Sequence, residues 1–545
     1  MTTEAGSGVV SGGHPTASED VTAGLSSICQ AFQATAARKR DEMALRLLEE
    51  GIEWTWGEYA ARVRRAAGGL HTLGVRHGDA VAILARNRPE HLVADMAALH
   101  LGASPFAIYA TSAPAQIEYV IRDSGARVLI SEPVFDATVE AVEPLCPQLE
   151  HVVRLTPGAP ELDEGELSAF DFQAGWRAVA PDDVVCLVYT SGTTGPPKGA
   201  EITHAGLLAD LRGTWRSLGV PKHLSAVSFL PYAHILERFM SYYSPAVLGG
   251  EVTFCPDPAM LSAVLAQSRP SVLVSPPRVW EKLRAKCEAL AADQAEFALA
   301  AGLGDLEVAG VGAAPVPVML LEFFQAAGVP LRQGWGMTEL SAFGTVTSTD
   351  PADNGTCGRP IEGLELRIAD DGELLARGPM VIGGYRNLPE KTAEAIDADG
   401  WLHTGDIGRI DDEGRLTIVD RKKELIINAA GKNMSPANIE AELKNASPLI
   451  GQAVCIGNDR PCNVALLVLD PEVAAGYPDQ EALNAEVVRG VGAANASLSR
   501  VEQIKRYTIL DSEWLPGGDE LTPTMKLKRK PIEVKYQAEI DALYT

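Results

Sequence analysis

The chain has 545 residues, of which 46% are hydrophobic and 22% are charged, and its formal net charge is -25 at pH 7. This length exceeds one ordinary domain, and the composition is that of a globular protein with enough apolar material for a large core. The negative charge argues against nucleic acid as a partner, because nucleic acids are themselves polyanions. No apolar run approaches the roughly 18 residues that span a bilayer, so no transmembrane segment is predicted.

The start of the chain lacks the basic residues and apolar block of a signal peptide. We therefore expect a disordered tail over residues 1–24. Eight cysteines are scattered along the chain without a C-x-x-C pair. This pattern favours free thiols in a reducing compartment over a metal cage or a disulfide framework, and it predicts a cytoplasmic protein.

Much of the chain repeats one pattern, an apolar strand followed by a glycine or proline loop and a helix. It occurs at 80–103, 126–131, 271–283 and 306–324. This alternation predicts an α/β architecture with largely parallel sheets.

The stretch VYTSGTTGPPKGAEITH, residues 188–204, interleaves three glycines with hydroxyl side chains and one lysine, Lys198. Glycine allows the backbone to form concave nests of N–H groups that bind anions. A buried strand is predicted before it, over 183–189, and a helix capped by Thr203 after it. The G-K-[ST] junction of kinases and GTPases is missing, because Gly199 follows the lysine. A mobile surface loop is the alternative.

From about residue 360 the sequence pattern changes to that of short strands joined by tight turns, with the turn signals DDG and DEG. This predicts a barrel-like β unit. Beyond residue 423, strands and helices mix again, as in a small α+β domain. The charged segment 420–424 lies between the predicted β unit and the predicted α+β domain.

Five separated motifs resemble those of the adenylate-forming superfamily, which comprises the acyl-CoA synthetases and other AMP-binding enzymes, and they stand in its order. They are YTSGTTGPPKG, GWGMTE (334–339), GWLHTGD (400–406), DRKKELI (420–426) and LTPTMKLKRK (521–530). Three forms resemble its long-chain fatty acyl-CoA synthetase branch, namely LPYAHILER, PPRVWEKL and PTMKLKR.

The resemblance implies a large N-terminal AMP-binding domain over 25–419, with parallel-rich αβ sheets and a β-barrel-like subdomain. It also implies a hinge at 420–424 and a small C-terminal α+β lid domain over 425–545. The implied reaction uses ATP and Mg²⁺ to convert a carboxylic acid to an acyl-adenylate, which coenzyme A then takes as a thioester. Two alternatives stay open, delivery of the acyl group to a carrier protein and a non-enzymatic ATP-binding regulator.

The resemblance implies that the glycine-rich loop holds the β- and γ-phosphates of ATP. The implied nucleotide-binding residues are Thr190, Ser191, Gly192, Thr193, Thr194, Gly195, Lys198, Gly312, Ala313, Ala314, Gln333, Gly334, Trp335, Gly336, Met337, Thr338, Asp406 and Arg421. Among them, Asp406 would bind the ribose hydroxyls with Arg421 beside it, and 312–314 would lie against adenine.

Glu339 and Thr190 are the implied Mg²⁺ ligands, since oxygen ligands suit this hard cation. For Glu339, the alternative is a helix N-terminal carboxylate that interacts with the helix dipole.

Lys526 resembles the lysine that bridges the substrate carboxylate and the α-phosphate. The alternative is a solvated basic face, because Lys528, Arg529 and Lys530 follow it. Met525 departs from the commoner glycine at its position, a departure that the long-chain branch shares. Lys528 is the second choice for the same role.

Lys423 falls on the implied hinge position, and Gly431 and Lys432 align with the loop that lines the path of the CoA thiol. The segment LPYAHILER implies an acyl pocket with His234, Ile235 and Ala342 on its walls. Amino-acid-activating relatives carry an aspartate where this chain has Ile235, so we expect a hydrophobic acid and not an amino acid. We expect Glu237 to pair with Arg238 or to lie on the surface.

Overall fold

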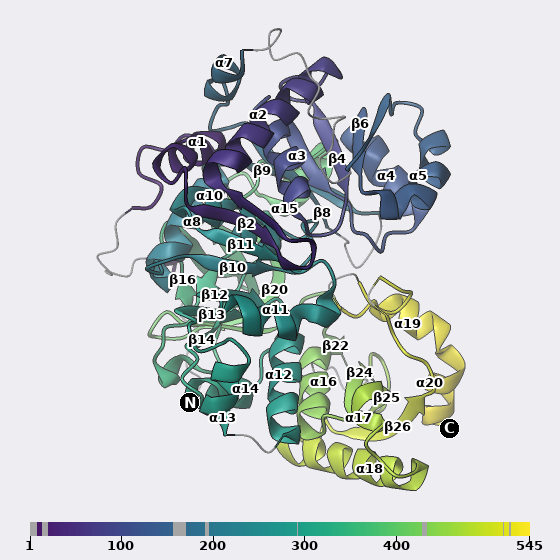
Figure 1. The fold of residues 1–545 in the computed structure, drawn as a ribbon. Coiled ribbons are helices and arrows are strands. Elements are labelled where there is room, and N and C mark those ends of the chain that lie inside the picture. The colour runs from purple at the N-terminus through teal and green to yellow at the C-terminus, as the bar shows by residue number, and fades with distance from the viewer. Residues whose placement is uncertain are drawn as a thin grey trace.

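A computed structural model describes residues 8–12, 20–155, 171–190, 196–290, 293–427, 433–515, 517–522 and 525–545. The chain folds into a large N-terminal part and a smaller C-terminal part, coloured yellow-green to yellow in Figure 1. The predicted α/β class is confirmed, as the strands and helices below show.

The first sheet has the order β5-β4-β6-β7 and is parallel throughout. Its strands are β4 (Ala80–Leu84), β5 (Ser104–Ala107), β6 (Val128–Ser131) and β7 (His151–Arg154). The connecting helices are α3 (Pro89–Leu99), α4 (Pro114–Ser124) and α5 (Asp136–Val142). Every residue of β4 and of α3 is buried. The strand β4 is apolar throughout, whereas α3 also buries the polar residues Glu90, His91 and Asp95.

The second sheet has the order β16-β15-β14-β13-β12-β10-β11-β2-β3. It is parallel from β2 to β14 and antiparallel at both edges. Its strands are β2 (Met43–Leu47), β3 (Ile52–Thr55), β10 (Ser225–Ser228), β11 (Glu251–Phe254), β12 (Val272–Ser275), β13 (Val308–Val311), β14 (Leu331–Trp335), β15 (Thr345–Val346) and β16 (Arg359–Pro360). The helices of this region are α1 (Ile28–Arg38), α2 (Trp56–Thr72), α7 (Phe172–Arg177), α8 (His204–Leu218), α11 (Leu261–Ser268), α12 (Pro277–Ala289), α13 (Gln294–Ala300) and α14 (Val318–Ala326).

The glycine-rich segment lies in a hairpin of β8 (Val184–Thr190) and β9 (Lys198–Thr203), which pair antiparallel. The strand β19 (Gly384–Tyr385) extends this sheet at β9. The predicted strand and the helix α8 are both confirmed, and the Thr203 side chain caps α8 by accepting from the N–H of Gly206. We expected the glycine-rich loop to lead directly into the helix, and this is wrong. The residues KGAEIT between them form a second strand, β9, which pairs antiparallel with β8.

The predicted β unit is an antiparallel sheet in the order β1-β17-β18-β20-β21. Its strands are β1 (Val10–Ser11), β17 (Glu365–Ile368), β18 (Glu373–Arg377), β20 (Leu402–Ile410) and β21 (Leu416–Arg421), and the helix α15 (Pro389–Ala395) precedes β20. The expectation of disorder throughout 1–24 is wrong for Val10–Ser11. These two residues pair with β17, whose edge would otherwise expose unpaired backbone groups.

The C-terminal part is the predicted α+β unit. Its sheets have the orders β22-β23 and β24-β25-β26. The strands are β22 (Ile426–Ile427), β23 (Asn433–Met434), β24 (Ile450–Ile456), β25 (Asn463–Leu469) and β26 (Ile504–Leu510). The helices are α16 (Pro436–Ala446), α17 (Pro471–Ala474), α18 (Gln480–Ser497), α19 (Arg529–Lys535) and α20 (Gln537–Tyr544).

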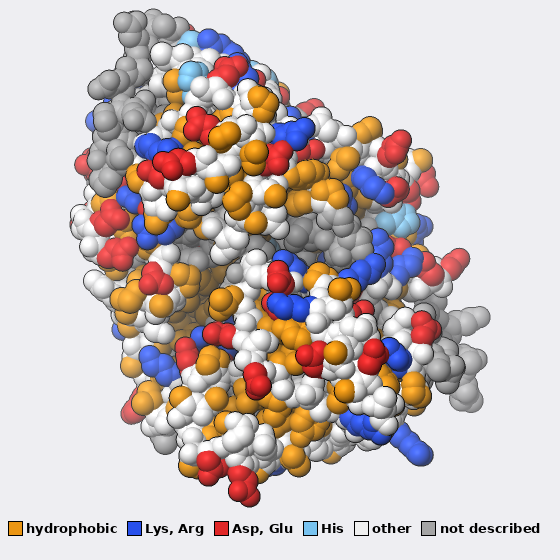
Figure 2. Space-filling view, turned by 90° about the vertical axis from the view of Figure 1, so that its right-hand side faces the viewer, with side chains coloured by type: hydrophobic (Ala, Val, Ile, Leu, Met, Phe, Trp, Pro, Cys, Tyr) orange, Lys and Arg blue, Asp and Glu red, His pale blue; other side chains and the backbone are white. Residues whose placement is uncertain are grey.

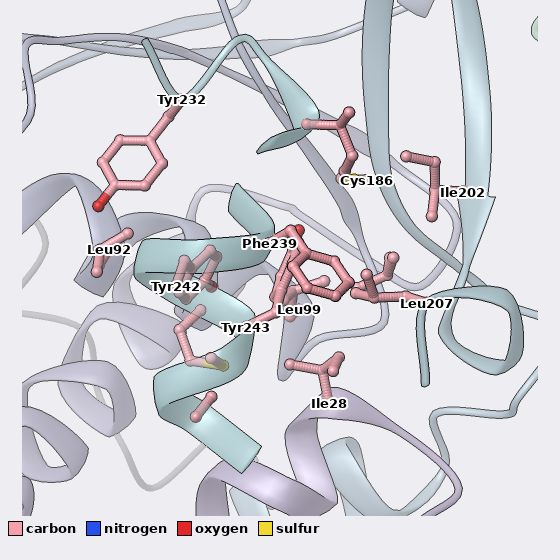
Figure 3. Packing of buried hydrophobic residues seen from close by; sticks show 14 of the residues in the cluster. Ile28, Leu92, Leu99, Cys186, Ile202, Leu207, Tyr232, Phe239, Tyr242 and Tyr243 are labelled. Atoms are coloured by element: carbon pink, nitrogen blue, oxygen red, sulfur yellow. The ribbon is translucent and has the colours of Figure 1, made fainter. Parts of the chain in front are cut away.

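A helical segment with a π-helical middle crosses the main core. It runs through α9 (Ile235–Arg238), the π-helix Phe239–Tyr243 and α10 (Ser244–Leu248). Figure 3 shows Phe239, Tyr242 and Tyr243 pointing from this segment into the apolar cluster. The expectation for Glu237 is wrong: its carboxyl group is buried and accepts from the N–H of Leu230 at 3.2 Å. Burial raises the pKa of Glu237 to about 7.

Arg238 pairs instead with Asp95 of α3, at 2.7 Å between Nη2 and Oδ2, and both side chains are 1% exposed. Such a pair joins two elements that are far apart in the sequence. Arg238, which directly follows Glu237 in the sequence, therefore has its ion-pair partner on another helix, α3.

The two parts of the molecule meet along α12 and α17. Arg278 of α12 is ion-paired with Asp470, which also caps the N-terminus of α17. Lys282 Nζ lies 3.6 Å from Glu472 Oε1. None of the helices in the described ranges is both long and apolar enough to cross a bilayer.

Candidate active site

The glycine-rich loop leaves and re-enters its hairpin at Thr190 and Lys198, which face each other across β8 and β9. The Thr190 hydroxyl donates to the Lys198 carbonyl at 3.5 Å. Five of the predicted phosphate-binding residues lie outside the described residues, namely Ser191, Gly192, Thr193, Thr194 and Gly195. The two ends of the loop nevertheless place a hydroxyl and an ammonium at the same edge of the sheet.

Lys198, Tyr385 and Glu339 form a compact group at this edge. The Lys198 ammonium lies 4.0 Å from the centroid of the Tyr385 ring. The Tyr385 hydroxyl donates to Glu339 Oε1 at 2.7 Å. Burial lowers the pKa of Lys198, and the charge of Glu339 opposes this shift. With Thr190, Glu339 supplies the kind of oxygen ligand that Mg²⁺ prefers.

Asp406 lies on β20 opposite Arg421 of β21. Its Oδ1 is ion-paired with Arg421 Nε at 2.7 Å, and its Oδ2 accepts a hydrogen bond from the indole N–H of Trp335 at 2.8 Å. Burial raises the pKa of Asp406, while Arg421 and Trp335 lower it. The structure thus brings together three residues that the sequence motifs supply separately.

The ends of β13 and β14 approach each other closely beside this group. A Cβ on Gly312 would stand 2.5 Å from the Gly334 carbonyl oxygen, and one on Gly336 would stand 2.0 Å from that of Ala342. Ala313 and Ala314 are exposed. Glycine at 312 and 336 is therefore required for the close backbone approach, while Ala313 and Ala314 present small side chains to the surface.

The remaining residues of GWGMTE and its neighbours turn the chain from β14 toward Glu339. The N–H of Gln333 donates to Thr347 Oγ1 at 2.9 Å, so Gln333 fixes the strand edge. Met337 packs partly against the main core, and Thr338 begins the 3₁₀ turn Thr338–Leu340 that carries Glu339.

Lys526 comes from the C-terminal part and reaches this site. Met525 before it has a φ of +64°, a left-handed conformation that favours glycine. Lys526 is an exposed residue, yet the protein groups around its ammonium partly remove water from it, and this loss of water and the nearby Arg421 lower the pKa of the ammonium. Asp406 and Glu339 oppose this shift, so both carboxylates lie within electrostatic reach. Figure 2 shows a recess between the upper and lower parts, with Lys and Arg side chains along its edge.

The residues after Lys526 face other groups. Lys528 Nζ donates to the Gly518 carbonyl at 2.7 Å. Arg529 is ion-paired with Glu440 at 2.6 Å and with Glu424 at 3.1 Å. Only part of the basic run is therefore a solvated face, and Lys526 is the member whose pKa depends on Asp406 and Glu339.

The residues predicted to line the acyl pocket are His234, Ile235 and Ala342. His234 caps α9, because its Nδ1 accepts from the N–H of Leu236 at 3.2 Å. Burial, with a smaller effect of the Lys526 charge, lowers the pKa of His234 to about 4. The ring is therefore neutral at pH 7 and lies near Lys526. Ile235 and Ala342 are buried in the main core.

The predicted hinge follows the last strand of the five-stranded sheet. Lys423 is exposed, and its charge acts on Lys198. Its neighbour Lys422 is ion-paired with Glu373 at 2.9 Å and with Asp371 at 2.5 Å. Gly431 and Lys432 lie outside the described residues.

Two family models match the chain, the AMP-binding enzyme over residues 32–386 and the AMP-binding enzyme C-terminal domain over residues 423–545. The chain belongs to the AMP-binding enzyme family. It is 46% identical over 433 residues to a putative fatty-acid–CoA ligase, fadD11, of Mycobacterium tuberculosis, a match that covers 69% of this chain and 76% of that protein. It is 34% identical over 583 residues to the long-chain-fatty-acid–CoA ligase FadD15 of Mycobacterium bovis, which covers 93% of this chain and 95% of that one.

Solved structures share the fold of this AMP-binding enzyme. The anthranilate CoA ligase AuaEII, in complex with anthranoyl-AMP, has a TM-score of 0.78 at 22% identity, covering 96% of this chain and 100% of that one. A fatty acyl CoA synthetase of Mycobacterium tuberculosis has a TM-score of 0.69 at 24% identity, covering 94% and 99%.

Sequence reasoning missed one residue at the centre of this AMP-binding enzyme's site, Tyr385. Its signal is weak, an aromatic residue that directly follows Gly383 and Gly384. It also missed that Arg529 is enclosed by two carboxylates. Charge runs do not reveal partners that lie on another element, and Glu440 belongs to α16.

We expect Trp335→Phe to weaken AMP binding about tenfold, because Asp406 loses its indole donor and a hydrogen bond to a charged group contributes about 1.5 kcal/mol or more. Calorimetric titration with AMP measures this. The matched control is Trp215→Phe, which removes an indole bond to Ser244 at 2.9 Å in the core. Equal losses in both variants would contradict a specific role of the Trp335–Asp406 bond.

Proposed function

We propose that this protein activates a hydrophobic carboxylic acid with ATP and then joins it to coenzyme A. In the first step a carboxylate oxygen bonds to the α-phosphorus and pyrophosphate leaves. In the second, the CoA sulfur bonds to the acyl carbon, the thiol proton passes to solvent, and AMP leaves. The observation that carries the proposal is the position of Lys526 within reach of Asp406 and Glu339.

The first step brings an anion to a tetra-anionic nucleotide. The carboxylate is already ionised at pH 7, so the site needs no general base. It needs positive charge and alignment, as in other phosphoryl transfers. Lys198 and Lys526 supply this charge from two different parts of the chain, and their lowered pKa values reflect partial removal of water.

The proposed nucleotide-binding residues are those of the family motifs. Asp406, held by Trp335 and Arg421, offers its carboxylate to the ribose hydroxyls. The exposed edge at Gly312, Ala313 and Ala314 would receive adenine. Glu339 and Thr190 would hold Mg²⁺, which neutralises phosphate charge when bound.

The acceptor is coenzyme A. The relatives fadD11 and FadD15 are both named as fatty-acid–CoA ligases, and no observation favours a carrier protein. We place the hinge at 420–424, between a domain over 25–419 and a lid over 425–545, with Lys423 as pivot. The lid would turn away from the site before the second step, and 431–432 would then line the thiol's path.

We propose that the acid is a fatty acid, as in the names of the relatives. Ile235 is 2% exposed and belongs to the apolar core, so it offers no counter-ion to a substrate ammonium. An ammonium buried here would cost several kcal/mol. A cytoplasmic location stays a prediction from the scattered cysteines.

We expect Lys526→Ala to lower acid-dependent ATP–pyrophosphate exchange by about 10²-fold to 10³-fold, because removing one charged contact to a transition state has this effect. Thioester formation from supplied acyl-adenylate and CoA should remain largely intact. Both half-reactions are measured separately on the purified variant.

The matched control is Lys528→Ala, which removes an ammonium of the same segment that bonds to a main-chain carbonyl. It should have the milder effect on exchange. Undiminished exchange in Lys526→Ala would contradict the assignment.

Activity should rise from acetate through medium-length to longer hydrophobic acids, because each buried CH₂ contributes up to about 0.8 kcal/mol. Free amino acids should be inactive, because Ile235 stands where a carboxylate would be needed to pair with the ammonium of an amino acid. A panel of acids, assayed for AMP release that requires CoA, measures this order. Preference for acetate or for an amino acid over every acid of about eight or more carbons would overturn this account of the pocket.

A further inference from the structure

Tyr385 is held more firmly than a residue of an ordinary connecting loop. It pairs with Ala200 in the β19–β9 ladder, and its N–H donates to Thr392 Oγ1 at 2.9 Å. The next residue, Arg386, donates its N–H to the Gly199 carbonyl at 2.8 Å and is ion-paired with Glu201 at 2.6 Å. The ring of Tyr385 is therefore fixed against the strand that begins at Lys198.

The two ends of this one side chain contact opposite charges. Its ring face receives the Lys198 ammonium at 4.0 Å, and its hydroxyl donates to Glu339 Oε1 at 2.7 Å. In the described part of the chain, Lys198 has no carboxylate within ion-pair distance. Tyr385 thus contacts the ammonium of Lys198 with its ring and the carboxylate of Glu339 with its hydroxyl.

A direct pair would occupy both groups that the nucleotide needs. A cation on an aromatic face is attracted only moderately, so an incoming phosphate can displace the ring as its partner. A carboxylate that accepts one hydrogen bond through Oε1 keeps Oε2 available to a hard cation. One tyrosine therefore keeps the ammonium and the carboxylate ready at once.

We propose that Tyr385 is the positioning residue that orients Glu339 toward Mg²⁺ and separates Lys198 from Glu339 until ATP binds. The proposal rests on the proposed function of the site, because it takes Lys198 and Glu339 as the groups that meet the nucleotide and its metal. Tyr385 itself transfers no atom or proton.

Two substitutions divide the contribution of the hydroxyl from that of the ring. Tyr385→Phe keeps the aromatic face and removes the hydrogen bond to Glu339. Tyr385→Leu removes both and lets Lys198 approach Glu339. Each full-length variant is titrated with ATP by calorimetry without Mg²⁺ and then over a series of Mg²⁺ concentrations, so that binding is read rather than turnover.

Tyr385→Phe should bind metal-free ATP as the unaltered protein does, while the Mg²⁺ concentration that gives half of the metal-dependent gain in affinity rises about tenfold. Tyr385→Leu should lose affinity for ATP in both conditions. The matched control is Tyr189→Phe, on strand β8 of the same sheet, which removes a hydroxyl bond of 2.8 Å to Asp123. It should leave the Mg²⁺ requirement unchanged.

A merely structural role is separated by combining Tyr385→Phe with Glu339→Gln. If the hydroxyl acts through Glu339, the Phe substitution should change the Mg²⁺ requirement no further in the Gln background. An unchanged requirement in Tyr385→Phe alone, or an equal change in both backgrounds, would overturn the proposal. Failure of the proposed function would look different, because the unaltered protein would then bind ATP without any gain from Mg²⁺.

Discussion

The reaction requires positive charge between two anions that repel each other, and we propose that Lys526 delivers part of this charge from the C-terminal part of the chain. Lys526 lies near Asp406 and Glu339 of the large N-terminal part, although burial and Arg421 make its charged state less favourable. The loop that presents it holds Met525 at a φ of +64°. A residue other than glycine there stores roughly 1–2 kcal/mol of strain. The proposed role of Lys526 therefore works against local stability, and contacts elsewhere must compensate for it.

These compensating contacts lie on both sides of the site. Arg529, close to Lys526 in the chain, is ion-paired with Glu424 and Glu440, so it ties this segment to residues 420–424 and to α16. At the far side, Arg278 and Lys282 of α12 meet Asp470 and Glu472 at the start of α17. The pairs of α12 and α17 are ionic rather than apolar, and Lys282 and Glu472 are exposed. Such an interface can separate and form again without exposing a hydrophobic surface.

The sequence predicted the elements whose residues carry a periodic or continuous apolar pattern, such as β4, α3, β12 and α12. It also named Asp406, Arg421 and Lys526 through motifs, and the structure brings these together. It failed where a partner lies far away in the chain. The Glu237 carboxyl group is buried and accepts a hydrogen bond from the N–H of Leu230. Arg238 pairs with Asp95, and Val10–Ser11 pair with the edge strand β17. Tyr385 was missed for the same reason, because its role depends on two residues from other strands and turns.

We propose that the orientation seen here serves the first step and must change before the second. Cysteines at Lys282 and Glu472, whose side chains are 55% and 77% exposed, allow the two parts to be joined by a cleavable thiol crosslinker. Seven of the eight native cysteines are buried, and the single-cysteine variants are the controls. The joined protein should form acyl-adenylate and release pyrophosphate, yet make no acyl-CoA until the link is cleaved. Unchanged acyl-CoA formation in the joined protein would contradict it.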